Sequence, residues 1–229
     1  MHESHRRASW TPVVAAIALV AALGWLTGPA LFAHGARQAG VVTLAAGFAG
    51  WEFVTDPAVA IGQVCTVGSE GVIAVAGSPL GYIATTSSHH DYRLHAEWRW
   101  SGKPGNSGAL VHVNGGPKDR QWPVCFQVQW KNTAAGDVLP MAGATFAEPL
   151  STPPAATTPL INRKGPDSER PVGEWNACDV VCQGRAIEVT VNGVPQNRVT
   201  GLSVAEGKVG FQLEGTPFEL RNVSITPLR

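Results

Sequence analysis

The segment Tyr92–Trp100 reads YRLHAEWRW, a strict alternation of apolar and polar side chains. Successive side chains of a β-strand point to opposite faces, so one face of this segment is aromatic and aliphatic and the other is polar. This pattern predicts a strand in a half-buried sheet, with the apolar face towards a hydrophobic core. The fold is therefore expected to be built from strands.

The polar face of this strand carries Arg93, His95, Glu97 and Arg99. Two interpretations are open: an outer face in water, which is the more common case, or a polar row lining a sugar-binding sheet. Val124–Trp130 shows a similar split, with Gln127 and Gln129 opposite Phe126 and Val128. Two polar rows on two strands favour a polar groove that both strands share.

Eight further short segments read as strands, each bounded by Gly, Pro, Asn or Ser, and no convincing amphipathic helix follows residue 50. They are Gly71–Ala76, Gly81–Thr86, Gly108–Val113, Val124–Trp130, Ala177–Cys182, Ala186–Val191, Lys208–Glu214 and Phe218–Thr226. Asn-Gly pairs at Asn192-Gly193 and Asn114-Gly115 are typical of tight hairpin turns. The pattern predicts an all-β antiparallel sandwich or jelly roll.

Residues 133–172 interrupt this pattern with seven of the 17 prolines. Loops of this length are uncommon in compact domains, and they often act as lids. We expect a long irregular loop over one face of the sandwich.

The first 36 residues form a hydrophobic leader. Arg6 and Arg7 precede a run over residues 13–33 in which 17 of 21 side chains are apolar. Such a segment is typical of a signal peptide cut near Ala33-His34-Gly35, or of a helix that anchors the chain in the membrane. Either case predicts export across the cytoplasmic membrane, to a periplasmic or extracellular location or to the membrane surface. The expected organisation is a leader (1–36), a linker (37–50) and a sandwich (51–229).

The formal net charge of the 229-residue chain is zero, and only 15% of its residues are charged. A nucleic-acid binder needs a basic stripe to neutralise phosphates, so this class of partner is excluded. The four cysteines, Cys65, Cys125, Cys178 and Cys182, allow disulfides outside the cytoplasm or act as small buried side chains. Cys178 and Cys182 cannot pair within one extended strand.

Four of the seven histidines, His89, His90, His95 and His112, fall within 24 residues. A neutral imidazole is a natural base near neutral pH. No His spacing typical of a metal site occurs, and His89 and His90 would point to opposite faces. Neither a metal ion nor another cofactor is expected.

Six segments, taken together and in this order, resemble the 3-keto-disaccharide hydrolase domain family, also described as 3-keto-glucoside lyase/hydratase domains. They are Glu97–Trp100, Gly102–Gly108, Pro171–Asn176, Val191–Gly193, Gly210–Gly215 and Leu220–Val223. The resemblance runs from about Trp51 to Leu228. It implies a concanavalin-like sandwich that acts on glycosides whose 3-hydroxyl has been oxidised to a ketone.

The implied reaction is an elimination followed by hydration. A 3-keto group acidifies the hydrogen on C2, so a base removes it, the C1 substituent leaves, and water adds to the unsaturated sugar. The reaction needs a base, a group that stabilises the enolate and help for the leaving group. It does not need the paired carboxylates of ordinary glycosidases.

The resemblance also suggests site residues. Glu97 and Arg99 match the family's Glu-x-Arg strand; Arg99 would stabilise an enolate, and Glu97 would orient it or act as base. The alternative is a structural ion pair. Asn106-Ser107-Gly108 keeps the family's Asn-Ser-Gly motif and would contact sugar hydroxyls, or merely join two strands. His95, Gln127 and Gln129 complete the expected substrate-binding set.

Two departures from the family bear on activity. The family usually has a Glu where this chain has Gln127, and a glutamine cannot accept a proton as a base. An arginine common after the Asn-Ser-Gly motif is replaced by His112, which leads to the hypothesis that His112 supplies the missing basicity. If the family's Glu at this position is its base or a metal ligand, the activity of this chain is lost or moved.

The sequence thus predicts an exported hydrolase or lyase for 3-keto-glycosides, with Glu97, Arg99 and His112 as catalytic residues. One alternative is a non-catalytic carbohydrate-binding sandwich, in which Trp122 and Trp130 stack on a pyranose ring. The other is an envelope domain without sugar affinity. Gln127 favours these alternatives.

Overall fold

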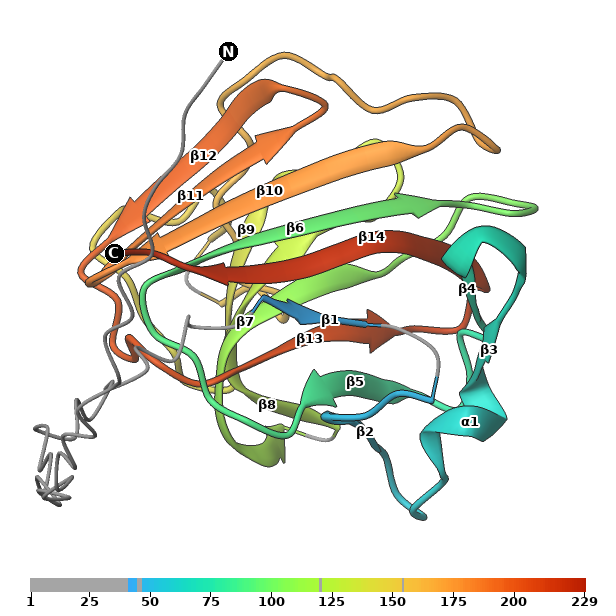
Figure 1. The fold of residues 1–229 in the computed structure, drawn as a ribbon. Helices are drawn as coiled ribbons and strands as arrows, with labels where there is room; N and C mark the ends of the chain where they lie inside the picture. Colours follow the sequence, from blue (N-terminus) through green and yellow to red (C-terminus); the bar gives the residue numbers. More distant parts are fainter. Residues whose placement is uncertain (1–40, 45–46, 120, 154) are drawn as a thin grey trace, which may run out of the picture. The chain divides into compact units, whose positions relative to one another are not determined.

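The computed structural model describes residues 41–44, 47–119, 121–153 and 155–229, which form two β-sheets packed face to face (Figure 1). The predicted leader, with its hydrophobic helix and possible anchor at residues 13–33, lies outside the described residues. Within the described ranges, no helix is long and apolar enough to cross a bilayer.

The larger sheet has eight strands, and all of its neighbours pair antiparallel. Its order is β12 (Val194–Thr200), β11 (Ala186–Val191), β10 (Asn176–Gln183), β6 (Tyr92–Arg99), β14 (Phe218–Pro227), β4 (Ile73–Val75) and β3 (Cys65–Val67). The short strand β1 (Val42–Thr43) pairs with β14. The sandwich therefore begins inside the 37–50 stretch that the sequence predicted as a linker.

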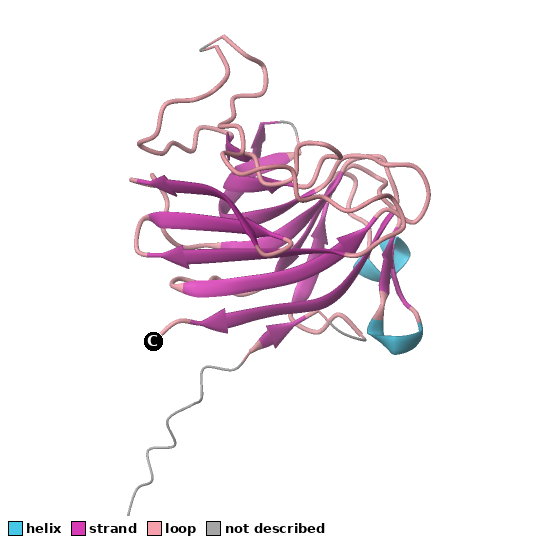
Figure 2. Cartoon of the chain, turned by 90° about the horizontal axis from the view of Figure 1, so that it is seen from above, coloured by secondary structure: helices cyan, strands magenta, loops and turns pink. Residues whose placement is uncertain are grey.

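The smaller sheet has six strands, again all antiparallel. Its order is β2 (Trp51–Val54), β5 (Gly81–Thr85), β13 (Lys208–Leu213), β7 (Gly108–Asp119), β8 (Trp122–Gln129) and β9 (Val138–Met141). Helical structure is limited to α1 (Ile61–Val64) and the 3-10 turn η1 (Ser69–Gly71), which are the two cyan elements in Figure 2.

The predicted all-β antiparallel sandwich is confirmed, and each of the nine predicted segments contains a strand. Five strands, β1, β2, β3, β9 and β12, are not among the predicted segments. The first four have two to four residues each, which is too short for alternation to be seen. β12 has seven residues, but its sequence VPQNRVT does not alternate apolar and polar side chains. β9 lies inside the proline-rich stretch that was predicted to be irregular throughout.

One of the two predicted hairpin turns is confirmed. Asn192 and Gly193 both have positive φ, 50° and 80°, and Val191 pairs with Val194 across them, as a two-residue type I′ turn requires. The turn predicted at Asn114-Gly115 is wrong. The chain bulges there, between Val111 and Asn114 and again beyond it, but β7 continues to Asp119.

Large aromatic side chains hold the two sheets together. Trp98 of β6 stacks on Trp130, which follows β8, with ring centroids 4.7 Å apart and planes 5° from parallel. Phe211 of β13 packs against Trp130 at 5.5 Å. All three are fully buried, so the predicted apolar face of β6 is the core face of the larger sheet. Trp130 is therefore a core residue and cannot stack on a sugar.

The four cysteines are free and buried. Cys178 and Cys182 lie on β10 with their side chains in the main core, among aliphatic and aromatic neighbours. Burial raises the pKa of Cys65, Cys178 and Cys182 to about 12. Of the two interpretations left open by the sequence, the structure shows small buried side chains.

A cleft on the outer face of the smaller sheet

A cleft of about 870 Å³ lies on the face of the smaller sheet that points away from the larger sheet. Its floor comes from β8 and β13, because Gln127, Gln129 and Gln212 alternate with core residues along these strands. Its walls come from β9 and from the long loop after it, residues 142–160. The prediction that the proline-rich stretch covers one face of the sandwich is confirmed for the part that lines this cleft.

The floor of the cleft is a row of three buried amides. The Nε2 atom of Gln127 donates hydrogen bonds to Oε1 of Gln129 and to Oε1 of Gln212, both at 2.7 Å. Gln127 and Gln212 lie on strands separated by β7, so the Gln127 side chain crosses over β7 to reach its partner. The row leaves the Nε2 groups of Gln129 and Gln212 available to other acceptors.

Gly108 of β7 makes this crossing possible. A Cβ atom at this position would lie 2.8 Å from Nε2 and 2.9 Å from Cγ of Gln127, and 2.7 Å from the carbonyl oxygen of Val128. These separations are shorter than real Cβ contacts, so a side chain at 108 would displace the amide. The glycine of the Asn-Ser-Gly motif therefore makes room for the Gln127 amide that forms the cleft floor.

Two carboxyl groups and one ammonium group stand at one end of this floor. Burial raises the pKa of Glu214, and Lys131 and Asn106 partly oppose this shift. Burial likewise raises the pKa of Asp137, against a hydrogen bond from the backbone N–H of Arg163 and the charges of Arg163 and Lys131. Such carboxyl groups are poised to exchange protons in a cleft.

Asn106 and Ser107 have different roles. Asn106 lines the cleft, and its Nδ2 donates a 2.6 Å hydrogen bond to Oε2 of Glu214. Ser107 is fully buried, and its Oγ donates to the backbone oxygen of Gln212 at 2.7 Å. The prediction that Ser107 binds substrate is therefore wrong, because this hydroxyl fixes β13 beside the turn and does not face the cleft.

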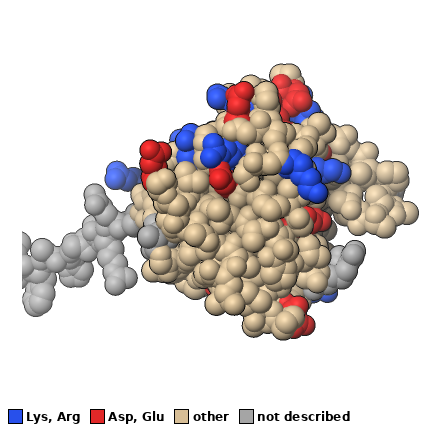
Figure 3. Space-filling view, turned by 90° about the vertical axis from the view of Figure 1, so that its right-hand side faces the viewer, with Lys and Arg blue, Asp and Glu red and all other residues tan. Residues whose placement is uncertain are grey.

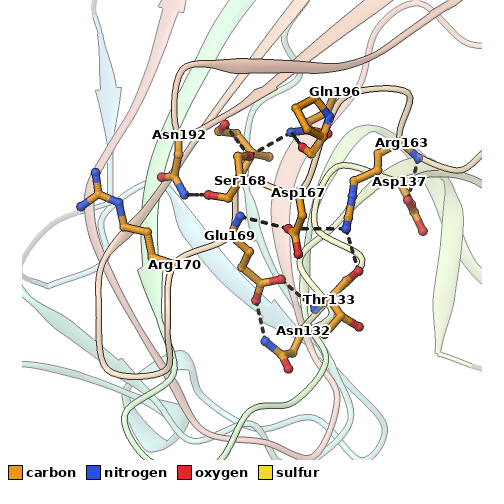
Figure 4. A network of polar contacts seen from close by, with 12 residues as sticks. Asn132, Thr133, Asp137, Arg163, Asp167, Ser168, Glu169, Arg170, Asn192 and Gln196 are labelled. Carbon is orange, nitrogen blue, oxygen red and sulfur yellow. Dashed lines mark hydrogen bonds and ion pairs between the residues drawn. The ribbon is translucent and has the colours of Figure 1, made fainter.

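A polar network attaches the long loop to the end of the floor (Figure 4). The Glu169 carboxylate accepts hydrogen bonds from Nδ2 of Asn132 at 2.9 Å and from the backbone N–H of Thr133 at 2.7 Å. Asp137 accepts the backbone N–H of Arg163 at 2.7 Å, and Arg163 donates to the backbone oxygen of Thr133. Residues 131–137, which carry Lys131 and Asp137, are thus held in place from the loop side.

The predicted catalytic strand β6 lies in the other sheet. Its polar residues form cross-strand pairs on the outer face of the larger sheet: Arg93 and His95 with Asp179, Glu97 with Arg221 and Asn222, and Arg99 with Glu219. The Trp175 ring lies against the guanidinium groups of Arg99 and Arg221, 4.6 Å and 4.2 Å from its centroid. The predicted groove shared by β6 and β8 is wrong, because the two polar rows lie on different sheets and face opposite directions.

Glu97 shows the electrostatics of a structural pair. Burial alone would raise its pKa, but hydrogen bonds from Asn222 and Arg221 hold the pKa of this carboxyl below its usual range. A carboxylate stabilised in this way is a weak base. Glu97, Arg99 and His95 are absent from the lining of the cleft.

His112 lies in the core and not in the cleft. It is 1% exposed, and its ring packs edge-on against Tyr92 and Phe126, with centroids 5.7 Å and 6.5 Å away. Burial lowers its pKa to about 4. A bulge in β7, where His112 has a φ of 53°, turns the side chain inwards. The hypothesis that His112 supplies basicity to a bound sugar therefore fails for lack of access.

Four residues of the cleft were not predicted from the sequence: Lys131, Asp137, Gln212 and Glu214. The alternation that predicted Gln127 and Gln129 to share one face continues to Lys131, so Lys131 could have been predicted to lie on the same face. Gln212 and Glu214 lie in the quoted segment Gly210–Gly215; Gln212 is on β13, and Glu214 directly follows the last residue of this strand. Asp137 carried no local signal, because β9 was hidden in the proline-rich stretch.

The cleft offers no metal site among the described residues. No group of three or more His, Cys, Asp or Glu side chains there is arranged to hold an ion. On the face shown in Figure 3, acidic and basic side chains are interspersed and most of the surface carries no charge. An amide floor with few charges suits a ligand that is rich in hydroxyl groups and uncharged.

Comparison with known proteins identifies the family of the chain and structures that share its fold. The sequence profile of the 3-keto-alpha-glucoside-1,2-lyase-like domain matches residues 44–226. No curated protein matches the chain in sequence.

Several solved structures resemble this one. A proposed glycosyl hydrolase of Parabacteroides distasonis superposes with a TM-score of 0.60 at 22% identity, over 83% of this chain and 95% of that one. The carbohydrate-binding module CBM66 of Bacillus subtilis gives 0.53 at 11%, over 76% and 93%. A beta-1,3-1,4-glucanase from a mouse hindgut metagenome gives 0.52 at 10%, over 82% and 99%. At these identities the likenesses show the jelly-roll fold.

Proposed function

The chain belongs to the 3-keto-alpha-glucoside-1,2-lyase-like domain family, and on this premise we propose that it cleaves 3-keto-glycosides by elimination and hydration in the cleft of the smaller sheet. One observation supports this proposal most. The cleft brings Glu214 and Asp137, both with raised pKa values, together with the ammonium group of Lys131 beside a row of amides. These are the groups that the reaction requires.

In the proposed first step, Glu214 removes the proton from C2 of the sugar. The electrons of the C2–H bond form an enolate with the adjacent ketone at C3, and Lys131 stabilises the negative charge on its oxygen. Asn106 holds the Glu214 carboxylate through the 2.6 Å hydrogen bond and so orients it. The free Nε2 groups of Gln129 and Gln212 bind the other oxygens of the ring.

In the second step, the enolate electrons expel the substituent on C1 and leave a carbon–carbon double bond between C1 and C2. Asp137, whose pKa is raised by burial, is the general acid in this proposal and donates a proton to the departing oxygen. Water then adds across the double bond: it gives one proton back to Asp137 as its oxygen bonds to C1, and C2 regains a proton from Glu214. The net reaction is hydrolysis to 3-keto-glucose and the free alcohol.

Within this proposal, Gln127 does not abolish activity. The family's carboxylate at this position is replaced by an amide, and Glu214 stands across the same floor, two residues beyond the Gln212 that Gln127 contacts. The base has thus moved from β8 to the end of β13.

A non-catalytic carbohydrate-binding domain is the alternative function. The observation that favours it is the amide floor itself, since three neutral side chains bind hydroxyl groups without chemistry. In this case, the carboxyl groups of Glu214 and Asp137 would only accept hydrogen bonds from the sugar.

Incubation of the protein with 3-keto-trehalose separates the two functions. Release of 3-keto-glucose is expected, and Glu214→Gln should lower kcat about 10²–10⁴-fold, the usual contribution of a general base. Glu188→Gln is the matched control, because Glu188 is an exposed carboxylate paired with Arg198 on the larger sheet. Binding without release would establish the alternative.

Glu97→Gln in the same assay tests the earlier assignment to β6. Activity equal to that of the unaltered protein is expected, since Glu97 pairs with Arg221 on the opposite face of the sandwich. Loss of turnover without loss of stability would return catalysis to β6.

The pH profile provides an independent check. A base must be deprotonated, so kcat/KM should fall on acidification at a pH above the ordinary Glu range, because burial raises the pKa of Glu214. Asn106→Ala removes a hydrogen bond that favours the charged carboxylate, so the acidic limb should move to still higher pH. An unshifted limb in this variant would contradict the role of Glu214.

We also propose that the sandwich acts outside the cytoplasmic membrane, from the leader at residues 1–36. Fractionation of a bacterium that expresses the full chain should place it in the periplasm, the medium or the membrane. Alkaline extraction separates the last case, because an anchored chain stays with the lipid. Recovery in the cytoplasm would refute the proposal.

A further inference from the structure

The cleft changes from polar to apolar along its length, and two neighbouring strands set this gradient. On β8, every second residue faces the cleft side, so Gln129 and Gln127 are followed by Cys125. On β9, Leu139 pairs with Gln127 and Met141 pairs with Cys125, whereas Asp137 lies beside Gln129. Lys131, Asp137 and Glu214 therefore stand at one end, and the apolar groups of β8 and β9 at the other. The fourth charged lining residue, Glu148, comes from the loop, and its carboxylate is bound to Thr200.

The apolar end rests on a second hydrophobic cluster, separate from the core between the sheets. Leu110, Cys125 and Tyr82 are buried in it, and Trp122 and Met141 pack on top and line the cleft. Trp122 is half-buried, so part of its ring remains available to a ligand.

The long loop adds apolar side chains over the same cleft. Leu150 lines it and is 38% exposed, so among the residues that the structure describes it is one of few large apolar side chains with this much surface in water. Leu160 and Phe146 line the cleft from the same loop. Exposed apolar surface that lines a cleft marks a binding site.

The chemistry of the substrate connects these two ends. In a 3-keto-glycoside, the ketone carbon C3, the acidic C2 and the glycosidic C1 follow one another. With C2 at Glu214 and the ketone oxygen at Lys131, the substituent on C1 extends away from the charged end. We infer that this enzyme selects 3-keto-glycosides with an apolar, ring-shaped aglycone, which Trp122, Met141 and Leu150 bind; the inference rests on the proposed function for the placement of the sugar.

Two substrates with similar leaving groups test the selection. Cyclohexyl and methyl 3-keto-glucosides of the same anomer both release an alcohol, so a difference between them reports binding of the aglycone. The full chain should bind the cyclohexyl compound about tenfold more tightly, since five added methylene groups enter the apolar end in part. The binding is measured by calorimetry with the Glu214→Gln variant, and KM is measured with the unaltered enzyme.

Trp122→Ala should reduce this tenfold ratio to below threefold, and Trp175→Ala is the matched control. Trp175 is a half-buried tryptophan on the outer face of the larger sheet, so the ratio should stay tenfold there. Since Trp122 also covers the second cluster, Leu150→Asn provides a variant at an exposed position that leaves the fold intact, and it should lower the ratio as well.

The outcomes separate the inference from the proposed function. Turnover of both glycosides at equal KM, or a ratio unchanged in Trp122→Ala and Leu150→Asn, overturns the inference and leaves the function standing. Absence of turnover with both compounds overturns the function. Even then, a tenfold difference in dissociation constant that depends on Trp122 supports the apolar subsite, and equal constants refute it.

Discussion

At the scale of single residues, the side chains around Gln127 suit a glutamine at this position, where the family usually has a glutamate. Its Nε2 donates to two carbonyl oxygens, those of Gln129 and Gln212, in a position that is 2% exposed. A carboxylate has no donor and would face both acceptors. The amide at 127 and its two glutamine partners are therefore a consistent set, and not an isolated loss of a catalytic carboxylate.

Gln127→Glu should consequently destabilise the fold. The cost at neutral pH is about 1–3 kcal/mol, because a buried charge would lose its solvation and face two acceptors. Burial raises the pKa of such a carboxyl, so acidification restores one O–H donor and should recover part of the loss. Urea unfolding at pH 7 and pH 5 measures this, with Gln183→Glu at an exposed end of β10 as control. Equal stability of both variants at pH 7 would contradict the amide row.

At the scale of elements, the loop between β9 and β10 matters as much as the strands. Its tip covers the cleft and its return segment holds residues 131–137 through Glu169 and Arg163. The Asn192 side chain joins the same region: it accepts the N–H of Ala177 and donates to the backbone oxygen of Ser168, as Figure 4 shows for the latter contact. The hairpin β11–β12 thus helps to support the wall of the cleft.

Glu169→Ala should loosen the charged end of the cleft without unfolding the sandwich. Asn132 and the N–H of Thr133 lose their acceptor, so hydrogen exchange of amides in residues 131–137 should accelerate, and KM should rise several-fold. Exchange monitored by mass spectrometry tests this, and Glu188→Ala removes an exposed carboxylate as the control. Unchanged exchange in this segment would show that the loop is held by other contacts.

The pairing of strands also explains how much of the structure could be predicted from the sequence alone. Alternation in Tyr92–Trp100 correctly predicted which side chains enter the core, because this depends only on the strand itself. It could not tell in which sheet the strand lies, and so Glu97 and Gln127 were wrongly brought together. That information resides in pairing between distant segments, such as β6 with β10 and β14. Asp137 was missed for the same reason, since its place beside Gln129 follows from tertiary pairing.

At the scale of the whole molecule, the two outer faces of the sandwich differ in character. The larger sheet presents charges that are paired across strands, and the smaller sheet presents a cleft with a gradient from charged to apolar. Between them lies a core that contains an imidazole, His112, whose ring nitrogens have no hydrogen-bond partner within the described part of the chain. The core therefore carries a built-in sensitivity to acid.

The stabilisation that depends on the neutral imidazole of His112 should fall by about 3 kcal/mol as the pH drops from 6.5 to 4. The raised pKa values of Asp137, Glu169 and Glu214 add stability on acidification and offset part of this loss. Burial lowers the pKa of His112 to about 4 and also lowers that of His89, so the folded chain stays neutral where the unfolded chain binds protons. Glu97 and Glu148, with lowered pKa values, add losses only at lower pH, below the ordinary Glu range.

Denaturant unfolding across this range provides the measurement. His112→Asn keeps a residue that tolerates the positive φ and removes the buried imidazole, so its stability should vary less with pH. His90→Asn, at an exposed position, is the control. The assignment would be contradicted if the stability of His112→Asn changed with pH in the same way as that of the unaltered chain, or if His90→Asn altered the pH dependence as much as His112→Asn does.

The four buried thiols can report the order in which parts of the sandwich open. A cysteine is modified by alkylating reagents only as an exposed thiolate, and here Cys65, Cys125, Cys178 and Cys182 are buried, with pKa values far above neutrality. The four thiols report on three strands: Cys65 on β3, Cys125 on β8, and Cys178 and Cys182 on the two ends of β10. The order in which reagent adds to them under native conditions therefore records the order in which the strands open, without any label being introduced.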